Sequence, residues 1–355
     1  MHRVMIEEAS YDNCREAVNR AFDLFPVRIR DRRVLVKPNV LRSSEAEEGI
    51  VTHPAVLRAV IERVESEGPA RIVVGDNPGL VSYGANEACF RRTGLLEAAG
   101  DYYQNIGNEA EEVALDSELA ERVSVSRAVL EADVVISLPK FKTHGLTILT
   151  GGIKNSYGIL PGAQKARLHR LAGNPARFND VIVDVFRLRP PDLFILDAVI
   201  GMEGNGPASS DLRPIGRILA SDNGVALDAV MARMMGLDPA ALRFLETARR
   251  HGLGDFAPET IDVIGRLEVI PGFKLPHLDA GAGNLSSAIQ ELLHSRTVLR
   301  PEADPDSCTG CGTCVDQCPV SALVMTDDLP VVDKELCITC FCCQEICPEK
   351  AITLK

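Results

Sequence analysis

The sequence contains no tryptophan, and only 5% of its 355 residues are aromatic. Proteins that bind single-stranded nucleic acid usually stack the bases on aromatic side chains and meet the phosphates with a basic surface. Because the formal net charge is −12 at pH 7, we expect no nucleic-acid partner. No stretch approaches the roughly 18 consecutive apolar residues that a membrane-spanning helix needs, so we expect no membrane insertion either.

The first residues of the chain show no basic segment followed by an apolar run, which indicates a cytoplasmic protein. Nine of the eleven cysteines lie between Cys308 and Cys347. In a small secreted domain such a cluster would indicate disulfides, whereas here it indicates metal ligands in a reducing compartment. The two remaining cysteines, Cys14 and Cys89, are expected to be buried as small apolar residues.

The clustered cysteines form two runs of identical spacing, one starting at Cys308 and the other at Cys337. Each run reads Cys-x2-Cys-x2-Cys-x3-Cys-Pro, where x is any residue. This tail resembles the bacterial ferredoxins that bind two [4Fe-4S] clusters, in which the fourth cysteine of each run ligates the other cluster. The resemblance implies one cluster on Cys308, Cys311, Cys314 and Cys347, and a second cluster on Cys337, Cys340, Cys343 and Cys318.

Both cysteine runs suit iron, because thiolates are soft, anionic donors. A pair of structural zinc sites remains the alternative, since such sites also use cysteines separated by two residues. Cys342 fits neither run and is interpreted as a bystander. Nearby carboxylates such as Asp304, Asp316 and Asp327 disfavour the addition of an electron, so we expect clusters of low potential.

Residues 1–298 are expected to form an α/β domain, followed by a small α+β ferredoxin-like domain at residues 299–355. Short apolar runs alternate with helical patterns in the larger part, which predicts a largely parallel sheet with flanking helices. The expected strands are 33–36, 71–74, 133–137, 193–196 and 261–264, and the expected helices start near 54, 178 and 225. Residues 272–299 are expected to be a linker with one helix.

Polar motifs directly follow the expected strands, where ligands bind in open α/β sheets. Lys37-Pro38-Asn39 follows the first strand, Gly75-Asp76 the second and 140–144 the third, while Asp197 and the glycine-rich segment 201–207 follow the fourth. Together with Thr52-His53-Pro54, Gly152-Ile153-Lys154-Asn155, His169 and Asp228, these motifs resemble domain of unknown function 362 (DUF362), which is often fused to a ferredoxin tail. The resemblance implies an architecture and a site, but no general reaction.

Five side chains that are cationic or can become so occupy these motifs: Lys37, Lys140, Lys142, His144 and Lys154. In an acidic protein they are expected to form a positive pocket for a carboxylate or a phosphate. The catalytic candidates are Lys140, Lys142, His144 and Glu203, and the substrate-binding candidates are Lys37, Asn39, Thr143, Lys154 and Asn155. The competing interpretation is that these lysines are ordinary solvated surface residues.

Acid/base groups or a metal site in the large domain are a further alternative, with six candidate residues: His53, His144, His169, Asp76, Asp197 and Glu203. The glycines of segment 201–206 reverse the order of the dinucleotide fingerprint, and segment 151–155 lacks the spacing of a P-loop. We therefore predict neither NAD nor ATP as a cofactor.

The leading functional hypothesis is an iron-sulfur oxidoreductase that relays low-potential electrons through two [4Fe-4S] clusters to a small anionic molecule in the α/β domain. Fusion supports it, because a tether raises the effective concentration of the electron donor at the site. A second hypothesis is a non-enzymatic electron-transfer protein that docks a redox protein partner. A third is non-redox carbon-acid chemistry at a Lys/His/Glu site, with clusters that are structural or sensory.

Overall fold

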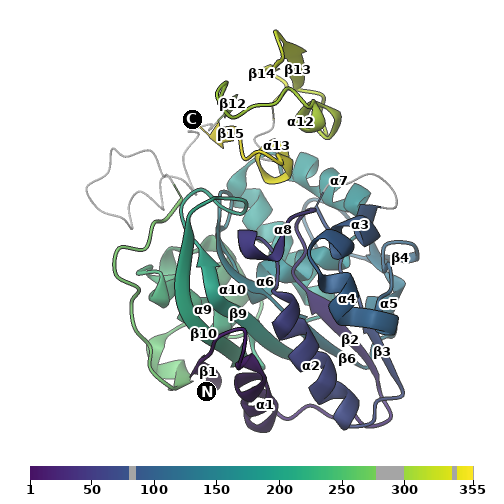
Figure 1. Cartoon of the computed structure of the whole chain (residues 1–355), viewed down its shortest axis with the longest axis vertical. Coiled ribbons are helices and arrows are strands. Elements are labelled where there is room, and N and C mark those ends of the chain that lie inside the picture. The colour runs from purple at the N-terminus through teal and green to yellow at the C-terminus, as the bar shows by residue number, and fades with distance from the viewer. Residues whose placement is uncertain (80–84, 277–299, 338–341, 355) are drawn as a thin grey trace.

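The structure is a computed structural model that describes residues 1–79, 85–276, 300–337 and 342–354 (Figure 1). The strands of its central sheet are His2–Glu8 (β1), Arg33–Pro38 (β2), Arg71–Val74 (β3), Val134–Leu138 (β6), Lys140–His144 (β7), Ile148–Thr150 (β8), Leu193–Met202 (β9), Leu212–Ser221 (β10) and Ile261–Ile264 (β11). Their order is β11-β1-β10-β9-β6-β2-β3, and β7 with β8 extends the sheet beside β9. A separate hairpin pairs Ala110–Ala114 (β4) with Arg122–Ser126 (β5).

Most neighbouring strands of the central sheet are parallel, including β2 with β3, β2 with β6, β6 with β9, and β1 with β11. All five strands expected from the sequence are present, and the predicted α/β class is confirmed. The strand β10 was not expected, because Pro214 and Gly216 weaken its strand signal. A register shift between Pro214 and Arg217 accommodates them, and β10 runs antiparallel to both β1 and β9.

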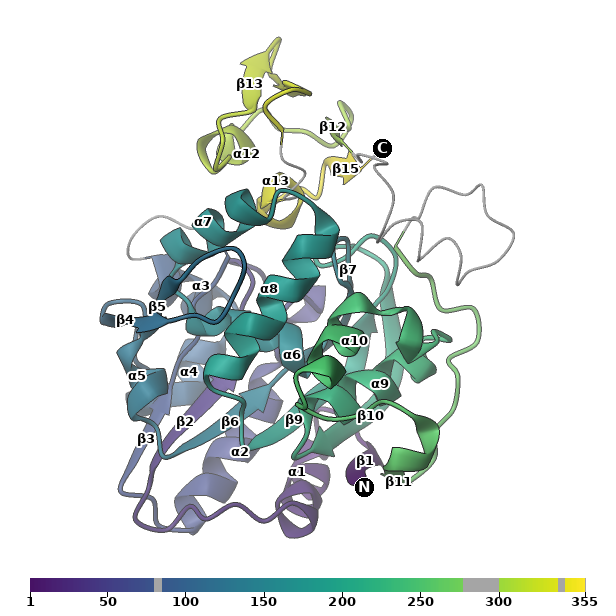
Figure 2. The same cartoon turned by 180° about the vertical axis from the view of Figure 1, so that it is seen from behind.

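Helices cover both faces of the sheet (Figures 1 and 2). One face packs against Cys14–Leu24 (α1), Pro54–Ser66 (α2), Ala85–Arg92 (α3) and Leu95–Ala99 (α4). The other face packs against Gly152–Asn155 (α6), Gly162–Ala172 (α7), Pro175–Leu188 (α8), Gly224–Met234 (α9) and Arg243–Arg250 (α10), while Arg127–Glu131 (α5) follows β5. The two apolar cores therefore lie on opposite sides of one sheet, and Cys14 and Cys89 are buried in the first of them, as expected.

The three expected helices correspond to α2, α8 and α9, and side-chain caps fix where each begins. The side chain of His53 accepts a hydrogen bond from Ala55 N at the start of α2, and Asn223 does the same for Ala226 N at the start of α9. Asn174 caps α8, which begins at Pro175, three residues before the expected start. One helix was also expected within residues 272–299. This segment lies outside the described residues from 277 onward.

The tail consists of short elements: Pro301–Ala303 (β12), Thr313–Asp316 (α12), Leu323–Thr326 (β13), Leu329–Val332 (β14), Cys342–Ile346 (α13) and Ile352–Leu354 (β15). Its two halves repeat the same local hydrogen bond. Ala322 N donates to Cys318 Sγ at 3.2 Å in the first half, and Ala351 N donates to Cys347 Sγ at 3.3 Å in the second. The repeat seen in the sequence is thus also a structural repeat.

The second half of the tail lies on the large domain, with α13 beside α7, whereas β13, β14 and α12 project away from it (Figures 1 and 2). Lys350 Nζ joins the two domains, because it lies 3.4 Å from Ser209 O and 3.6 Å from the Glu48 carboxylate. Within the described ranges, no helix is long and apolar enough to span a bilayer.

Candidate functional site

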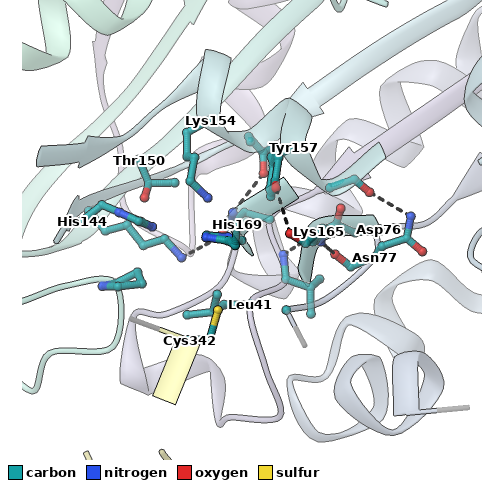
Figure 3. Close-up of a pocket in the computed structure, with 17 residues that line it drawn as sticks. Leu41, Asp76, Asn77, His144, Thr150, Lys154, Tyr157, Lys165, His169 and Cys342 are labelled. Atoms are coloured by element: carbon teal, nitrogen blue, oxygen red, sulfur yellow. Dashed lines mark hydrogen bonds between the residues drawn. The ribbon is translucent and has the colours of Figure 1, made fainter. Parts of the chain in front are cut away.

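A pocket opens where β2, β3 and β6 end, at the carboxyl edge of the sheet (Figure 3). Its cavity volume is about 60 Å³, and the wider hollow of about 570 Å³ is open to solvent. Its polar lining comes from the segments after β2 (Asn39) and β3 (Asp76, Asn77), from the β7–β8 hairpin (Lys142, His144, Thr150), and from α6, α7 and their connection (Lys154, Asn155, Tyr157, Lys165, His169). Asp76 is the one carboxylate among the described lining residues. The position is the one that open α/β sheets use for ligands.

The β7–β8 hairpin presents one face to this pocket. Lys142 is the cross-strand partner of Thr150, so both side chains lie on the same face, and the two-residue period of a strand places His144 there as well. Thr143 points to the opposite face, where its hydroxyl accepts a hydrogen bond from Gly206 N at 3.2 Å. Figure 3 shows His144, Thr150 and Lys154 along one side of the pocket.

Lys142 is held by neutral oxygens, although it is almost fully buried. Its Nζ donates to Asn39 Oδ1 at 2.8 Å and to Ile50 O at 2.7 Å. Asn39 Nδ2 in turn donates to Asn155 Oδ1, and Asn155 Nδ2 donates to Ser137 Oγ, both at 2.9 Å. This chain of hydrogen bonds fixes the orientation of both amides and aims the ammonium group of Lys142 at the pocket.

Aromatic rings position Lys154 and His169 on the neighbouring wall. Lys154 Nζ lies 5.1 Å from the ring centre of Tyr157 and 5.5 Å from that of Phe178, within cation–π range. His169 stacks on the ring of Phe178, with the two ring centres 4.2 Å apart. The ring of Tyr157 packs edge-on against both His169 and Phe178.

Lys165 completes this wall from α7 and was not anticipated from the sequence. Its Nζ donates to the backbone oxygens of Asn77 and Pro78, so it holds the segment after β3. Lys165 and His169 are four residues apart on α7 and therefore on one helix face, a spacing that could have identified Lys165 once His169 was suspected.

Two of the five expected cations lie outside the pocket lining, in buried ion pairs. Lys37 Nζ lies 2.7 Å from Asp76 Oδ1, and Lys140 Nζ lies 2.7 Å from Asp197 Oδ2. Burial lowers the pKa of both lysines, and the facing carboxylates oppose that shift. Gly158 is required beside the first pair, because a Cβ there would lie 2.1 Å from Asp76 Oδ1.

Glu203, one of the catalytic candidates, is buried outside the described pocket lining. Its carboxylate accepts a hydrogen bond from Lys274 N at 3.1 Å. The neighbouring glycine-rich segment does reach the pocket, since Pro207 is part of the lining. Gly206 lies so close to β7 that a Cβ would be 2.2 Å from Thr143 O, which explains why a glycine precedes Pro207.

The tail contributes to the same pocket through Cys342. Its side chain is buried and lines the pocket beside Leu41 (Figure 3). From the sequence, Cys342 was interpreted as a bystander that belongs to neither ligand set. It directly precedes Cys343, an expected ligand of the second cluster. The half of the tail that carries the second cysteine run therefore forms part of the pocket wall.

Four cysteines of the tail line a second, smaller pocket of about 320 Å³, open to solvent. They are Cys308, Cys311 and Cys314 from the first run and Cys347 from the second. This is the set that the ferredoxin pattern implies for one cluster. For the other set, Cys318, Cys337 and Cys343 are described, whereas Cys340 lies outside the described residues. The individual ligand assignments stay predictions.

Comparison with protein families matches two parts of the chain. Residues 34–233 match the model described as a domain of unknown function (DUF362), and residues 300–348 match a 4Fe-4S dicluster domain. The chain belongs to the DUF362 family. The predicted fusion is confirmed, and the dicluster domain makes this DUF362 member an iron-sulfur protein.

A thylakoid-associated protein of Synechocystis sp. (strain PCC 6803) is 34% identical over 252 residues, which cover 69% of this chain and 77% of that protein. Among solved structures, lactate racemase apoprotein from Thermoanaerobacterium thermosaccharolyticum matches with a TM-score of 0.39 and 12% identity, over 62% of this chain. A protein from Thermotoga maritima matches with a TM-score of 0.38 and 15% identity, over 54% of this chain. The DUF362 chain spans about half of each of these two structures, 53% and 51%, and likeness of this degree carries no argument about activity.

The alternative metal site of the DUF362 domain can be compared with the positions of its candidate ligands. His53 stacks on Tyr11 with ring centres 3.6 Å apart, and its Nδ1 caps α2, whereas His144 and His169 lie in the pocket. Within the ranges that the structure describes, no three His, Cys, Asp or Glu side chains lie together as metal ligands would. The candidates are thus divided: three lie in the pocket, two lie at the Lys140–Asp197 pair, and Glu203 lies apart from both.

Proposed function

We propose that the protein is an iron-sulfur oxidoreductase whose dicluster domain exchanges electrons with a small organic anion bound in the pocket. The observation that carries the proposal is the position of Cys342, which lines the same pocket as Lys142 and Lys154 and precedes the cluster-ligand candidate Cys343. Electron transfer needs a short path between the redox centres. A cluster bound by the second half of the tail would lie next to a molecule in this pocket.

The charge of the pocket supports an anionic substrate. Three lysines, Lys142, Lys154 and Lys165, line the pocket. Ammonium groups with little exposure to water attract an anion and also stabilise the negative charge that an arriving electron adds. In the proposed function these lysines therefore both bind the substrate and favour its reduction.

In the proposed function, the clusters lose electrons to the substrate or gain electrons from it. An external redox protein is therefore needed to return the clusters to their starting oxidation state. Each [4Fe-4S] cluster carries one electron at a time, so two clusters match the two electrons that most organic substrates exchange. In the reductive direction, a low-potential redox protein supplies both electrons through the first half of the tail, which projects away from the large domain (Figure 2).

A non-enzymatic electron carrier is the second candidate, and the exposed hairpin β13–β14 favours it. Val324 and Val331 form a cross-strand pair on this hairpin and are 56% and 48% exposed, next to the acidic turn of Asp327 and Asp328. Apolar surface with a charged rim is typical of a docking site for another protein. This candidate needs the hairpin but not the pocket.

The two candidates are separated by rapid mixing of anaerobically reduced holoprotein with small carboxylates and phosphates, following cluster reoxidation by absorbance and EPR. We expect at least one anion to reoxidise the clusters of the wild type, and much less in Lys142→Met and Lys154→Met. The exposed tail variant Lys334→Met serves as the control, with iron content checked in each protein. Clusters that no anion reoxidises, but that exchange electrons with a redox protein, would reject the oxidoreductase in favour of the carrier.

A further inference from the structure

Arg42 is a buried cation of the large domain that lies near the contact with the tail. The residue is 6% exposed, and its guanidinium group donates to Ser43 O at 3.0 Å and meets Glu48 Oε2 at 3.4 Å. Its Nε has no hydrogen-bond partner among the described residues. An arginine stays ionised even when it is buried, so this side chain carries a full positive charge with little exposure to water.

The segment around Arg42 contacts the tail at two points. Leu41, the preceding residue, lines the pocket beside Cys342 of the tail (Figure 3). Further along the segment, Glu48 Oε2 lies 3.6 Å from Lys350 Nζ, so one carboxylate oxygen meets a cation from each domain. Arg42 is therefore placed between two contacts with the second half of the tail.

Cys347 lies next to the same contact. Its backbone oxygen accepts a hydrogen bond from Lys350 N at 3.3 Å, and its Sγ accepts one from Ala351 N. It lines a hollow with three cysteines of the first run and is an expected ligand of the cluster there. Cys347 also acts on Arg42 through its charge: burial lowers the pKa of the guanidinium group, and Glu48 and Cys347 are the two groups that oppose this shift most.

A cluster that takes up an electron becomes more negative by one charge, so a cation nearby favours its reduction. We infer that Arg42 raises the reduction potential of the cluster that Cys347 helps to bind. The tail itself disfavours reduction, because residues 300–355 include ten acidic and four basic side chains. The large domain thus supplies a buried positive charge against this excess, and the docked tail accepts an electron more readily. This inference needs the clusters but no substrate in the pocket, so it goes beyond the proposed function.

Redox titration of the anaerobic holoprotein, followed by EPR, measures the midpoint potentials of the clusters without any substrate. Arg42→Met removes the charge, and we expect one cluster to become about tenfold harder to reduce, a shift of about 59 mV to lower potential. Arg42→Lys keeps a positive charge and is expected to stay within about threefold of the wild type. Arg15→Met is the control, because it removes an exposed cation on α1, at the opposite end of the molecule from the tail (Figure 1). Iron content and circular dichroism verify that each variant is folded.

Two results of the titration would overturn the inference: potentials that Arg42→Met leaves unchanged, or an equal shift in Arg42→Lys, which would assign the effect to packing rather than to charge. A second measurement needs no substitution at Arg42. If docking favours reduction, reduction must strengthen docking by the same factor. Limited proteolysis should therefore cleave the tail of the wild type more slowly in the reduced protein than in the oxidised protein. Equal cleavage rates would overturn the inference even if Arg42→Met released the tail.

Discussion

Lys140 and Lys142 lie two residues apart on β7 and are both almost fully buried, yet their surroundings differ. Lys140 Nζ meets the Asp197 carboxylate at 2.7 Å and Tyr11 Oη at 3.0 Å. Lys142 Nζ meets neutral oxygens of Asn39 and Ile50, and it lines the pocket. The two lysines show that burial alone does not separate a structural lysine from one that lines a pocket.

Two buried carboxylates, Asp197 and Asp228, also differ in the groups that surround them. Asp197 has Lys140 as a counter-charge, and it also accepts a hydrogen bond from His53 N at 2.9 Å. Asp228 is equally buried but accepts from the backbone N–H groups of Gly152 and Ile153, at 2.6 and 3.1 Å. Burial raises the pKa of Asp228 to about 7, against the opposing effect of these two hydrogen bonds.

The largest expected effect comes from breaking the buried ion pair on its cationic side. Lys140→Met leaves Asp197 charged and buried without its partner, so we expect a loss of about 3–5 kcal/mol in the free energy of unfolding. Denaturant unfolding of the anaerobic protein, followed by circular dichroism, measures it. The double variant Lys140→Met/Asp197→Leu removes both charges and should recover much of the loss. If the single variant is as stable as the wild type, the pair is not structural.

The second prediction concerns Asp228, whose hydrogen bonds in the described part of the chain come from backbone N–H groups. Because the folded-state pKa of Asp228 is raised above its unfolded value of about 4, its contribution to stability is complete below pH 4 and is lost as the pH rises through 7. The free energy of unfolding of the wild type should therefore fall relative to that of Asp228→Asn by up to about 4 kcal/mol between pH 4 and 8. Parallel pH profiles for the two proteins would contradict the raised pKa.

Lys142→Met removes two hydrogen bonds to neutral oxygens, whereas Lys140→Met removes a buried ion pair, so we expect Lys142→Met to affect stability less. Losing the hydrogen bonds to Asn39 Oδ1 and Ile50 O is expected to cost about 1–3 kcal/mol in unfolding. Binding of small carboxylates, measured by calorimetry, should weaken by at least about tenfold, because the ammonium group faces the pocket. A variant with unchanged anion binding would place Lys142 with Lys140 among the structural lysines.

Local sequence patterns were sufficient to predict the sheet and the cluster-binding tail. The strand β6, Val134–Leu138, is apolar except for Ser137 and is buried along its whole length, a pattern that is typical of a strand in a parallel sheet. The repeated cysteine spacing is equally local. The position of the pocket also followed from the sequence, because ligand sites lie where parallel strands end.

The sequence could not predict which residues contact each other within the site, because these contacts join segments that are distant along the chain. Asp197 lies 57 residues from Lys140, and no local pattern indicates that the two meet. Thr150 lines the pocket through the register of the β7–β8 hairpin, which places it opposite Lys142. Cys342 reaches the pocket because the tail docks on the large domain, a contact that cysteine spacing does not encode.

The smallest expected effect concerns Lys350, a lysine that is neither buried like Lys140 nor part of the pocket like Lys142. Its contact with Glu48 is 3.6 Å long, and both side chains are partly exposed to water, so the pair should contribute about 0–1 kcal/mol. Lys350→Asn tolerates the positive φ of this residue, 56°, and should lower the melting temperature slightly at low salt and hardly at all at 1 M salt. Limited proteolysis provides the sharper readout, because Cys342 should keep the tail on the pocket in the variant. If the tail of the variant is instead cleaved readily, Lys350 is needed to hold the two domains together. An exposed lysine would then matter as much for the structure as a buried one.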